Sequence, residues 1–327
     1  MKIANITHSD LDGTLCSLVL QNYYGVDNVD ITYVGYHNVN TSVMGALNKG
    51  IYDKVYITDI SISREVAEEI EKGFKEKVVL LDHHCNEKTL FLNEYTWAHI
   101  QENDETDLLK TSGCWMTYLY IMDNVVDTYE SEWCERIYNP VLADIVDLGR
   151  YYDTWLWETL PNKRPNSDKL NTLLYEYGFK RFMEECNRQI DVYESTYIGN
   201  SFDFGGINGI LLELYENKVN SYIKSASKRV FPMRFDGLFL GVFYGTQYTN
   251  KVCHALQDMF PRYDAIICVN MEGSTSIRTN KPNVNVNDLA IRIASINGFS
   301  GGGHKSASGI SIDPSFRADY IKRLLGL

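Results

Sequence analysis

The sequence lacks the cysteine spacings of a zinc knuckle or a disulfide framework. It has seven cysteines, an odd number, and no two of them form a Cys-x-x-Cys pair. Disulfide scaffolds and structural zinc sites usually show paired spacings, so neither is indicated here. The scattered pattern fits a reducing cytoplasm, which is the location we expect. The cysteines are Cys16, Cys85, Cys114, Cys134, Cys186, Cys253 and Cys268.

The sequence also lacks an excess of positive charge. Asp and Glu number 43 against 31 Lys and Arg, which gives a formal net charge of −12. Proteins that grip long nucleic acid through its phosphates usually carry a basic surface. We therefore expect no long nucleic acid as a partner. A phosphate-bearing ligand should be short, or should be held locally by metal ions.

Long hydrophobic runs are missing as well. No apolar stretch is long enough to cross a bilayer, and the first residues soon reach His8, Asp10 and Asp12, which does not fit a signal peptide. We expect no membrane partner. The 327 residues, 44% hydrophobic and 23% charged, are typical of a globular protein with room for two domains.

Three short apolar runs each end in carboxylate or imidazole groups. Residues 78–81 lead into Asp82-His83-His84, residues 3–7 lead into His8-Ser9-Asp10-Leu11-Asp12-Gly13, and residues 54–58 lead into Asp59. Open α/β sheets place their sites at the carboxyl ends of parallel strands. Hard divalent cations prefer this mixture of carboxylate oxygen and neutral imidazole. The pattern therefore indicates a metal site at one sheet edge.

Strand-like and helix-like segments alternate over the first 150 residues or so. This alternation predicts an α/β fold, with a parallel sheet covered by helices on both faces. The acidic residues Glu102, Asp104, Glu105 and Asp107 look like a solvated loop. The predicted strands are 3–7, 30–35, 54–60 and 77–82, and the predicted helices are 14–24, 41–49, 63–76, 114–123 and 133–147.

The rest of the chain predicts a helical stretch and then a second, smaller α/β domain. Residues 154–230 look helical, and their last part, 209–230, suits a connecting helix. After Pro232, β-type runs return at 237–244 and 265–269. A helix is expected over 287–297, with Gly298 just beyond its end.

A glycine-rich segment near the C-terminus, Gly301-Gly302-Gly303-His304, is a candidate anion-binding loop. Consecutive glycines let backbone N–H groups approach an anion closely, and a histidine at the loop's end can donate to a phosphate oxygen. A glycine triplet alone can also simply form a turn.

Taken together, these motifs resemble the DHH phosphoesterase superfamily with a C-terminal DHHA1 domain. They occur in the family's order and span nearly the whole chain. Within the superfamily, Tyr152-Asp153-Thr154-Trp155 and Ser276-Ile277-Arg278-Thr279 are similar to the nanoRNase B branch, also described as cyclic-nucleotide phosphodiesterase-like. The resemblance implies a DHH catalytic domain at 1–208 that includes helical 154–208, a linker helix at 209–230 and a DHHA1 substrate-binding domain at 231–327.

The resemblance also implies a site with two Mn²⁺ ions, for which Mg²⁺ or Co²⁺ could substitute. It places Asp59 between the ions, His8 and Asp10 on the first ion, and Asp12, His83 and Asp153 on the second. It gives catalytic roles to Asp82, His84 and His304, with Asp82 orienting the histidine pair. Substrate binding falls to Arg278, Gly301, Gly302, Gly303 and His304.

Some of these residues have simpler interpretations. Asp12-Gly13 could be a turn before a helix that starts at Thr14, and Asp59 could cap the helix that follows it. Many family members place the first-motif histidine where this chain has Ile6; here it lies two residues before the first Asp, as in the nanoRNase B branch. Asp144 and Asp147 are alternatives to Asp153, which is preferred because it lies within the Tyr-Asp-Thr-Trp match.

The function implied by the resemblance is Mn²⁺-dependent phosphodiester hydrolysis by a metal-bound hydroxide. The expected substrates are short oligoribonucleotides or linear or cyclic dinucleotides, cleaved to mononucleotides. The alternatives are a pyrophosphatase or pAp-type nucleotide phosphatase, a RecJ-like exonuclease, and a catalytically silent nucleotide-binding protein. Family II pyrophosphatases lack the Gly-Gly-Gly-His element, the acidic charge disfavours long single strands, and an intact ligand set argues against silence. The oligomeric state is left open.

Overall fold

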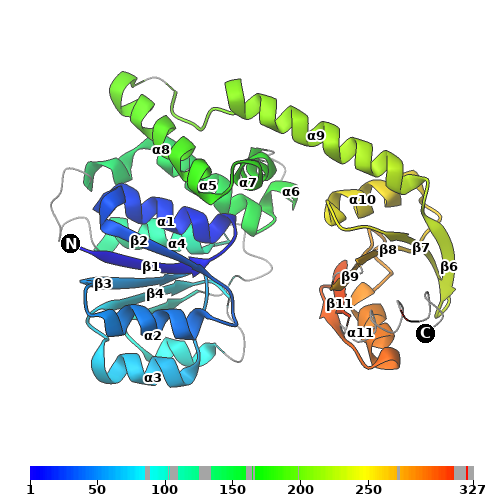
Figure 1. Cartoon of the computed structure of the whole chain (residues 1–327), viewed down its shortest axis with the longest axis horizontal. Helices are drawn as coiled ribbons and strands as arrows, with labels where there is room; N and C mark the ends of the chain where they lie inside the picture. The colour runs from blue at the N-terminus through cyan, green and yellow to red at the C-terminus, as the bar shows by residue number, and fades with distance from the viewer. Residues whose placement is uncertain are drawn as a thin grey trace. The chain divides into compact units, whose positions relative to one another are not determined.

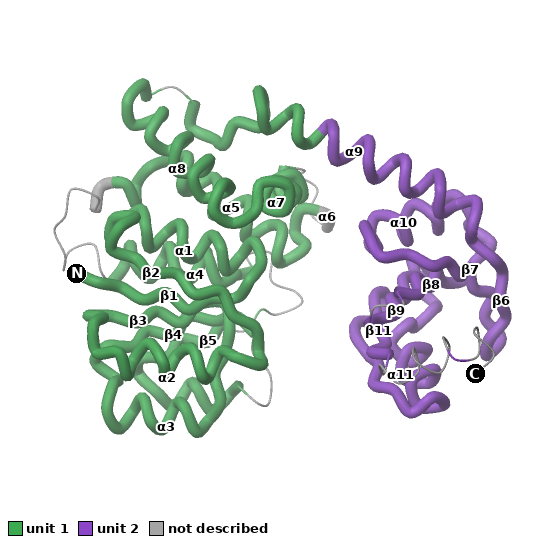
Figure 2. Tube along the Cα trace, viewed as in Figure 1, with its two compact units in different colours: residues 1–212 green, residues 213–327 purple. Residues whose placement is uncertain are grey.

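The computed structural model describes residues 1–84, 89–101, 103, 110–124, 134–159, 164, 166–197, 199–270, 273–312 and 322. The chain forms two compact units, residues 1–212 and residues 213–327 (Figure 2). Within the described residues, no helix combines the length and the apolar character needed to cross a membrane. The predicted acidic loop at residues 102–107 lies almost wholly outside the described residues, as does the first residue of the predicted helix 133–147.

Unit 1 is built on a parallel sheet of five strands in the order β2-β1-β3-β4-β5. All four neighbouring pairs are parallel, as predicted. Because the chain runs outward from β1 to β2 and then returns to β3 on the other side, the sheet has a switch point between β1 and β3. The strands are β1 (Ile3–His8), β2 (Val29–Val34), β3 (Lys54–Thr58), β4 (Val78–Asp82) and β5 (Ala98–Ile100).

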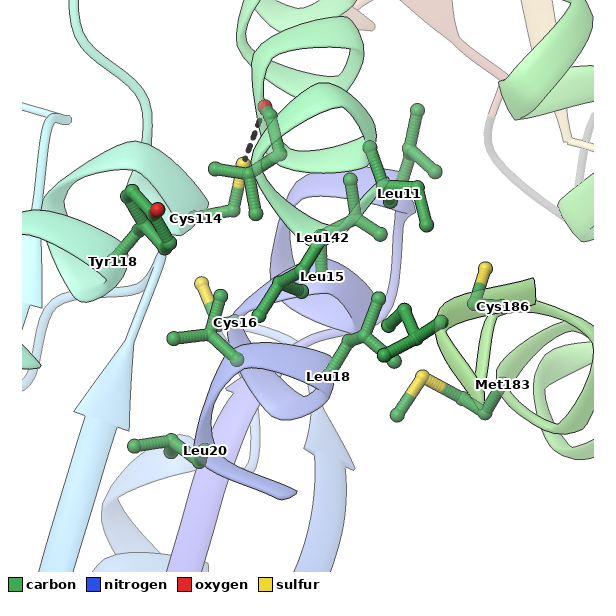
Figure 3. Close-up of a cluster of buried hydrophobic side chains, with 14 of the residues drawn as sticks. Leu11, Leu15, Cys16, Leu18, Leu20, Cys114, Tyr118, Leu142, Met183 and Cys186 are labelled. Carbon is green, nitrogen blue, oxygen red and sulfur yellow. Dashed lines mark hydrogen bonds between the residues drawn. The ribbon is translucent and has the colours of Figure 1, made fainter. Parts of the chain in front are cut away.

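Helices cover both faces of this sheet, as its alternating buried residues require (Figure 1). Ala4, Ile6 and Val55 face a core shared with α2 (Val39–Lys49) and α3 (Arg64–Gly73). Ile3, Tyr56 and Val79 face the opposite core, which includes α1 (Leu11–Tyr24) and α4 (Gly113–Asn124). Figure 3 shows the side chains of α1 in this second core, among them Leu11, Leu15 and Leu18.

Two further helices of unit 1, α5 (Pro140–Asp153) and α8 (Phe179–Thr196), pack on α1, and α7 (Asn166–Tyr177) packs on both of them. All 14 residues of α1 are buried, because the helix lies between the sheet and this outer layer. The layer consists of α5, α7 and α8. Shorter elements are η1 (Val26–Asn28), η2 (Leu90–Glu94), η4 (Cys134–Tyr138) and α6 (Leu156–Thr159).

Unit 2 contains a mixed sheet of six strands in the order β10-β11-β9-β8-β7-β6. Only the pair β7 and β8 is parallel. Helix α9 (Gly206–Ser227) crosses the boundary between the units, and Pro232 lies in β6 at the sheet edge, where a missing N–H is tolerated. The other elements are β6 (Phe231–Phe235), β7 (Leu238–Tyr244), α10 (Thr249–Met259), β8 (Ala265–Asn270), β9 (Ser274–Arg278), α11 (Val286–Asn297), β10 (Ser300–Gly303) and β11 (Ala307–Ser311).

The structure corrects the predicted glycine loop. Gly301, Gly302 and Gly303 lie in strand β10, which pairs antiparallel with β11. A Cβ on Gly301 would come within 2.8 Å of the Ala290 carbonyl oxygen and 2.9 Å of the Ala294 side chain. At Gly301, glycine is therefore needed because the strand passes directly over helix α11.

Candidate active site

The predicted site residues of unit 1 meet at the carboxyl ends of β1, β3 and β4. His8 ends β1, Asp59 follows β3 directly, and Asp82 ends β4. The ends of β1 and β3 flank the switch point of the sheet, which is where ligands bind in open α/β folds, and β4 lies next to β3. Asp153 reaches the same place from the last residue of α5.

The first group of ligand-type side chains consists of His8, Asp10 and Asp59. Their ligand-type atoms lie within 4.8 Å of one another. His8 Nδ1 is 2.6 Å from Asp10 Oδ2 and 3.9 Å from Asp59 Oδ2. Asp10 also caps helix α1, because its Oδ1 accepts the Gly13 N–H at 3.0 Å. The helix begins at Leu11, so the alternative of a turn at Asp12-Gly13 is wrong.

The second group consists of Asp12, His83 and Asp153, again with ligand-type atoms within 4.8 Å. His83 Nε2 lies 3.6 Å from Asp12 Oδ2 and 3.3 Å from Asp153 Oδ2. The same nitrogen is 3.2 Å from Asp59 Oδ1, so Asp59 touches both groups. This is the arrangement that the resemblance implies for a shared carboxylate, although the ligand roles themselves stay predictions.

Asp59 is held in an environment that does not satisfy its charge. Its side chain is 1% exposed, and neither carboxylate oxygen has a hydrogen-bond partner among the described residues. Burial raises the pKa of Asp59 well above its ordinary range, and the negative charges of Asp12 and Asp10 raise it further. Its backbone is left-handed, with φ 59°, and Ser63 rather than Asp59 caps α3. The capping alternative is therefore wrong.

Asp82 fixes the neighbouring histidine. Its Oδ1 contacts His84 Nδ1 at 2.8 Å, and its Oδ2 accepts a hydrogen bond from Ser61 Oγ at 2.5 Å. Burial opposes protonation of His84, but the hydrogen bond and the charge of Asp82 raise the pKa of the imidazole above its ordinary value. The hydrogen bonds described for Asp82 involve His84 and Ser61, so it orients one histidine of the pair directly.

Helix α4 makes a supporting contact that was not predicted from the sequence. The backbone N–H groups of Gly113 and Cys114 donate to Asp12 at 2.5 Å and 2.9 Å, which holds its carboxylate at the helix N-terminus. A Cβ on Gly113 would lie 2.6 Å from the Asp59 Cβ. The Ser112-Gly113 pair before an apolar stretch signals a helix start, but nothing in the sequence links it to Asp12.

The two alternatives to Asp153 have other partners. Arg164 donates to both Asp144 and Asp147, and Arg150 donates to Asp147 at 2.6 Å. Their charges are thus compensated by arginines, whereas Asp153 faces His83. The geometry favours Asp153 over Asp144 and Asp147 as the carboxylate that joins the second group.

The predicted substrate-binding residues of unit 2 share one end of its sheet. Arg278 ends β9 and pairs in register with Ala307 of β11, close in sequence to His304. Its guanidinium donates to Asn250 Oδ1 at 2.7 Å and to the Ser308 carbonyl at 3.1 Å. The Ser308 hydroxyl in turn donates to the His304 carbonyl at 2.8 Å.

The glycines of β10 support backbone anion binding less directly than expected. The Gly303 N–H already donates to Asn287 Oδ1 at 2.9 Å. The exposed His304 ring contacts the Ser306 hydroxyl through Nδ1 at 2.9 Å. This hairpin can therefore contact an anion through its side chains more readily than through a row of converging N–H groups.

Comparison with known proteins finds a similar oligoribonuclease sequence and solved structures of the same fold. No protein-family model matches the chain. The chain is similar to oligoribonuclease NrnB of Bacillus subtilis, with 27% identity over 316 residues that cover 94% of this chain and 72% of the relative.

Two solved structures share the fold. One is the DHH domain of a member of a family of ribosomal proteins, with a TM-score of 0.60 and 15% identity over 98% of this chain and 85% of that one. The other is the exonuclease RecJ bound to manganese, with a TM-score of 0.52 and 15% identity over 98% of this chain and 88% of that one. With the motif residues in place, these similarities support the resemblance to the DHH superfamily of phosphoesterases.

Proposed function

We propose that this chain, a hydrolase of phosphodiester bonds in the DHH superfamily, cleaves short oligoribonucleotides or dinucleotides to mononucleotides. The observation that carries the proposal is the pair of carboxylate–imidazole groups that share Asp59. The similarity to an oligoribonuclease over 94% of the chain supports the choice of substrate. We further propose that the activity needs divalent metal ions, with Mn²⁺ as the first candidate, because RecJ of the same fold is bound to manganese.

The residues present fit such ions. Both oxygens of Asp59 and Nε2 of His83 are buried and lack hydrogen-bond partners in the described part of the chain. Buried charged or polar groups are costly unless they are paired or coordinate a metal. In the proposed site His8 and Asp10 would hold one ion, Asp12, His83 and Asp153 would hold another, and Asp59 would contribute to both. When bound, two such ions supply a deprotonated water and neutralise the phosphoryl charge.

The chain's own residues orient this site. Gly113 and Cys114 hold the carboxylate of Asp12, and Asp82 holds Nδ1 of His84. With Nδ1 engaged, Nε2 is the ring nitrogen through which His84 can donate to a phosphate oxygen or to the leaving oxygen. We propose this as its role in the reaction, with Asp82 accepting the Nδ1 proton and favouring the doubly protonated imidazolium, in which Nε2 also carries a proton to donate.

Unit 2 is proposed to bind a nucleotide end. Arg278 is held by Asn250 and the backbone of β11, so its guanidinium is fixed before a ligand arrives. A fixed guanidinium suits phosphate recognition because it loses little freedom on binding. His304 lies on the adjoining turn and supplies a second donor.

The direct test is a hydrolysis screen of the full chain with Mn²⁺. The substrates are pGpG, pApA, RNA of two to five nucleotides, pAp, 3′,5′-cAMP, cyclic dinucleotides and pyrophosphate. We expect mononucleotides from the linear dinucleotides and short RNA, with no product after chelation. Turnover confined to pyrophosphate or pAp would replace the proposal with a phosphatase, and binding without turnover would replace it with a nucleotide-binding protein.

A further inference from the structure

Unit 1 contains a cavity of about 600 Å³ beside the proposed catalytic site. We propose that this cavity binds the nucleobase and ribose of the nucleotide that adjoins the scissile phosphate. The inference rests on the proposed function, since it names where one half of a dinucleotide lies. The walls of the cavity include Tyr36, Asn40, Ser61, Arg64, Thr89 and Phe91.

Residues that line the cavity contact the proposed catalytic residues. Ser61 donates to Asp82 at 2.5 Å, and Thr89 donates to the carbonyl of His84 at 3.1 Å. The ring of Tyr36 lies 6.0 Å from the ring of His8, measured between centroids. A nucleoside in the cavity could therefore be joined directly to a phosphate held at the carboxylate–imidazole groups.

The electrostatics of Tyr36 agree with this position. Burial raises the pKa of its hydroxyl, and the charges of Asp82, Asp59 and Asp10 raise it further. The Tyr36 hydroxyl is therefore within electrostatic range of carboxylates at all three strand ends that build the site, even though the residue is 62% exposed.

The size and the lining suit one nucleoside. Cavities of ~300–1,000 Å³ are typical of small-ligand sites, and such sites combine apolar walls with a few placed polar groups. Val39, Ile62 and Phe91 supply apolar surface here. A cavity of about 600 Å³ has room for one nucleoside, whose phosphate can then lie outside it at the catalytic groups.

Tyr36 offers a face on which a base can stack. Open aromatic rings next to nucleic-acid sites bind bases through their π-faces, whatever the base. Asn40 accepts the Ser63 N–H at 3.0 Å through Oδ1, which leaves its amide group to donate to a base edge. The Arg64 guanidinium lies over the Phe91 ring at 4.3 Å and provides a second planar surface.

A second phosphate fits this cavity less well than a base. Glu65 is one of the lining residues, and the carboxylate of Asp82 accepts a hydrogen bond from Ser61, another lining residue. An additional anion would meet these negative charges, whereas a neutral nucleobase would not. Arg64 offsets the charge of Glu65, so the lining has no net positive charge with which to attract a second phosphate, and a neutral nucleobase fits it better.

The test measures binding without catalysis. The metal-free full chain, kept in a chelator, is titrated with AMP, GMP, CMP, UMP and ribose 5-phosphate, and equilibrium binding is followed by ligand-detected NMR and calorimetry. Tyr36→Ala should lower the affinity for the mononucleotides roughly tenfold, in line with the usual loss of a base–aromatic stack. It should leave the affinity for ribose 5-phosphate unchanged. Tyr36→Phe should bind like the wild type. Tyr138→Ala, which removes another exposed tyrosine of unit 1, is the matched control.

The outcomes separate the cavity from the proposed function. Wild-type mononucleotide binding by Tyr36→Ala, or equal affinity for ribose 5-phosphate and mononucleotides, would overturn the nucleoside assignment even if dinucleotides are hydrolysed. If the chain binds mononucleotides in a Tyr36-dependent way but hydrolyses no diester, the nucleoside assignment of the cavity stands and the proposed function is wrong. Arg64→Ala should also weaken mononucleotide binding. If neither Arg64→Ala nor Tyr36→Ala weakens it, the cavity is not a base subsite.

Discussion

At the scale of single residues, Asp59 combines a strained backbone with a buried carboxylate that forms no hydrogen bonds within the described part of the chain. A non-glycine residue with positive φ and a buried carboxylate without hydrogen bonds are both costly. Such costs persist where function requires them. Our proposal gives a reason: the two proposed metal-binding groups need one carboxylate between them.

Substitution of Asp59 should therefore have opposite effects with and without metal. In chelator, Asp59→Asn should raise the melting temperature, because it removes a buried charge whose pKa is raised and whose ionisation at neutral pH costs stability. Asparagine also tolerates the left-handed backbone. With Mn²⁺ present, the same variant should lose metal by elemental analysis and at least ~10²-fold in turnover. Asp59→Ala should be worse, and turnover above about a hundredth of the wild type would remove the bridging role.

Gly113 is a second residue at which little change is tolerated. Gly113→Ala would place a Cβ 2.6 Å from the Asp59 Cβ and 2.9 Å from Asp12 Oδ2, so helix α4 must move away from both carboxylates. We expect lower metal content and a loss of activity of at least ~10²-fold, because ligand placement within fractions of an ångström is needed. Gly45→Ala in α2, where nothing lies within 4 Å, is the control and should be neutral or stabilising by ~0.5–1 kcal/mol. Equal behaviour of the two variants would contradict this account.

At the scale of elements, the sequence predicted the strands in which an apolar run is followed by charged residues. β1, β3 and β4 are buried on both faces, so they read as mainly apolar segments and place their following residues at one edge. His8, Asp10, Asp12, Asp59, His83 and Asp153 were proposed from their motifs, and the structure brings their side chains together.

Other elements gave no such signal. β5 has three residues and only one fully buried side chain, and β10 is a glycine strand at a sheet edge, so neither has a hydrophobic pattern. Gly301 to Gly303 were therefore predicted to form a loop. The contacts of Gly113 and Ser61 with site carboxylates depend on tertiary packing, which local sequence does not encode.

Helix α5 provides a comparison of three carboxylates on one element. Asp144 and Asp147 are held by Arg164, whereas Asp153 ends the helix beside His83. Asp153→Asn should reduce metal content and turnover by at least ~10²-fold. Asp147→Asn should keep both near wild type and lower stability by ~1 kcal/mol or less, as expected for a partly exposed ion pair. Metal loss in Asp147→Asn with none in Asp153→Asn would reverse the assignment.

At the scale of the whole molecule, the candidate residues divide between two units. The metal-type groups belong to residues 1–212, while Arg278 and His304 belong to residues 213–327. Arg278→Ala and His304→Ala should therefore leave metal content unchanged and lower kcat/KM, with the larger effect expected for Arg278 because its guanidinium is fixed by Asn250. Arg262→Ala is a control arginine in the same unit. Loss of metal in either test variant would contradict the division of labour.

The net charge of the chain bears on substrate length. With a formal charge of −12, a long strand gains little electrostatic attraction from the protein as a whole. A di- to pentanucleotide needs only local contacts, and binding energy from its far end can position the scissile phosphate. We expect kcat/KM to be highest for oligomers of two to five nucleotides and to fall with length, with a weak dependence on salt. The measurement compares RNA of two to thirty nucleotides between low and moderate salt. Equal or faster cleavage of a thirty-nucleotide strand, with a steep fall as salt is raised, would instead mean that many backbone phosphates are bound by Lys and Arg, and the short-substrate proposal would give way to a processive single-strand exonuclease.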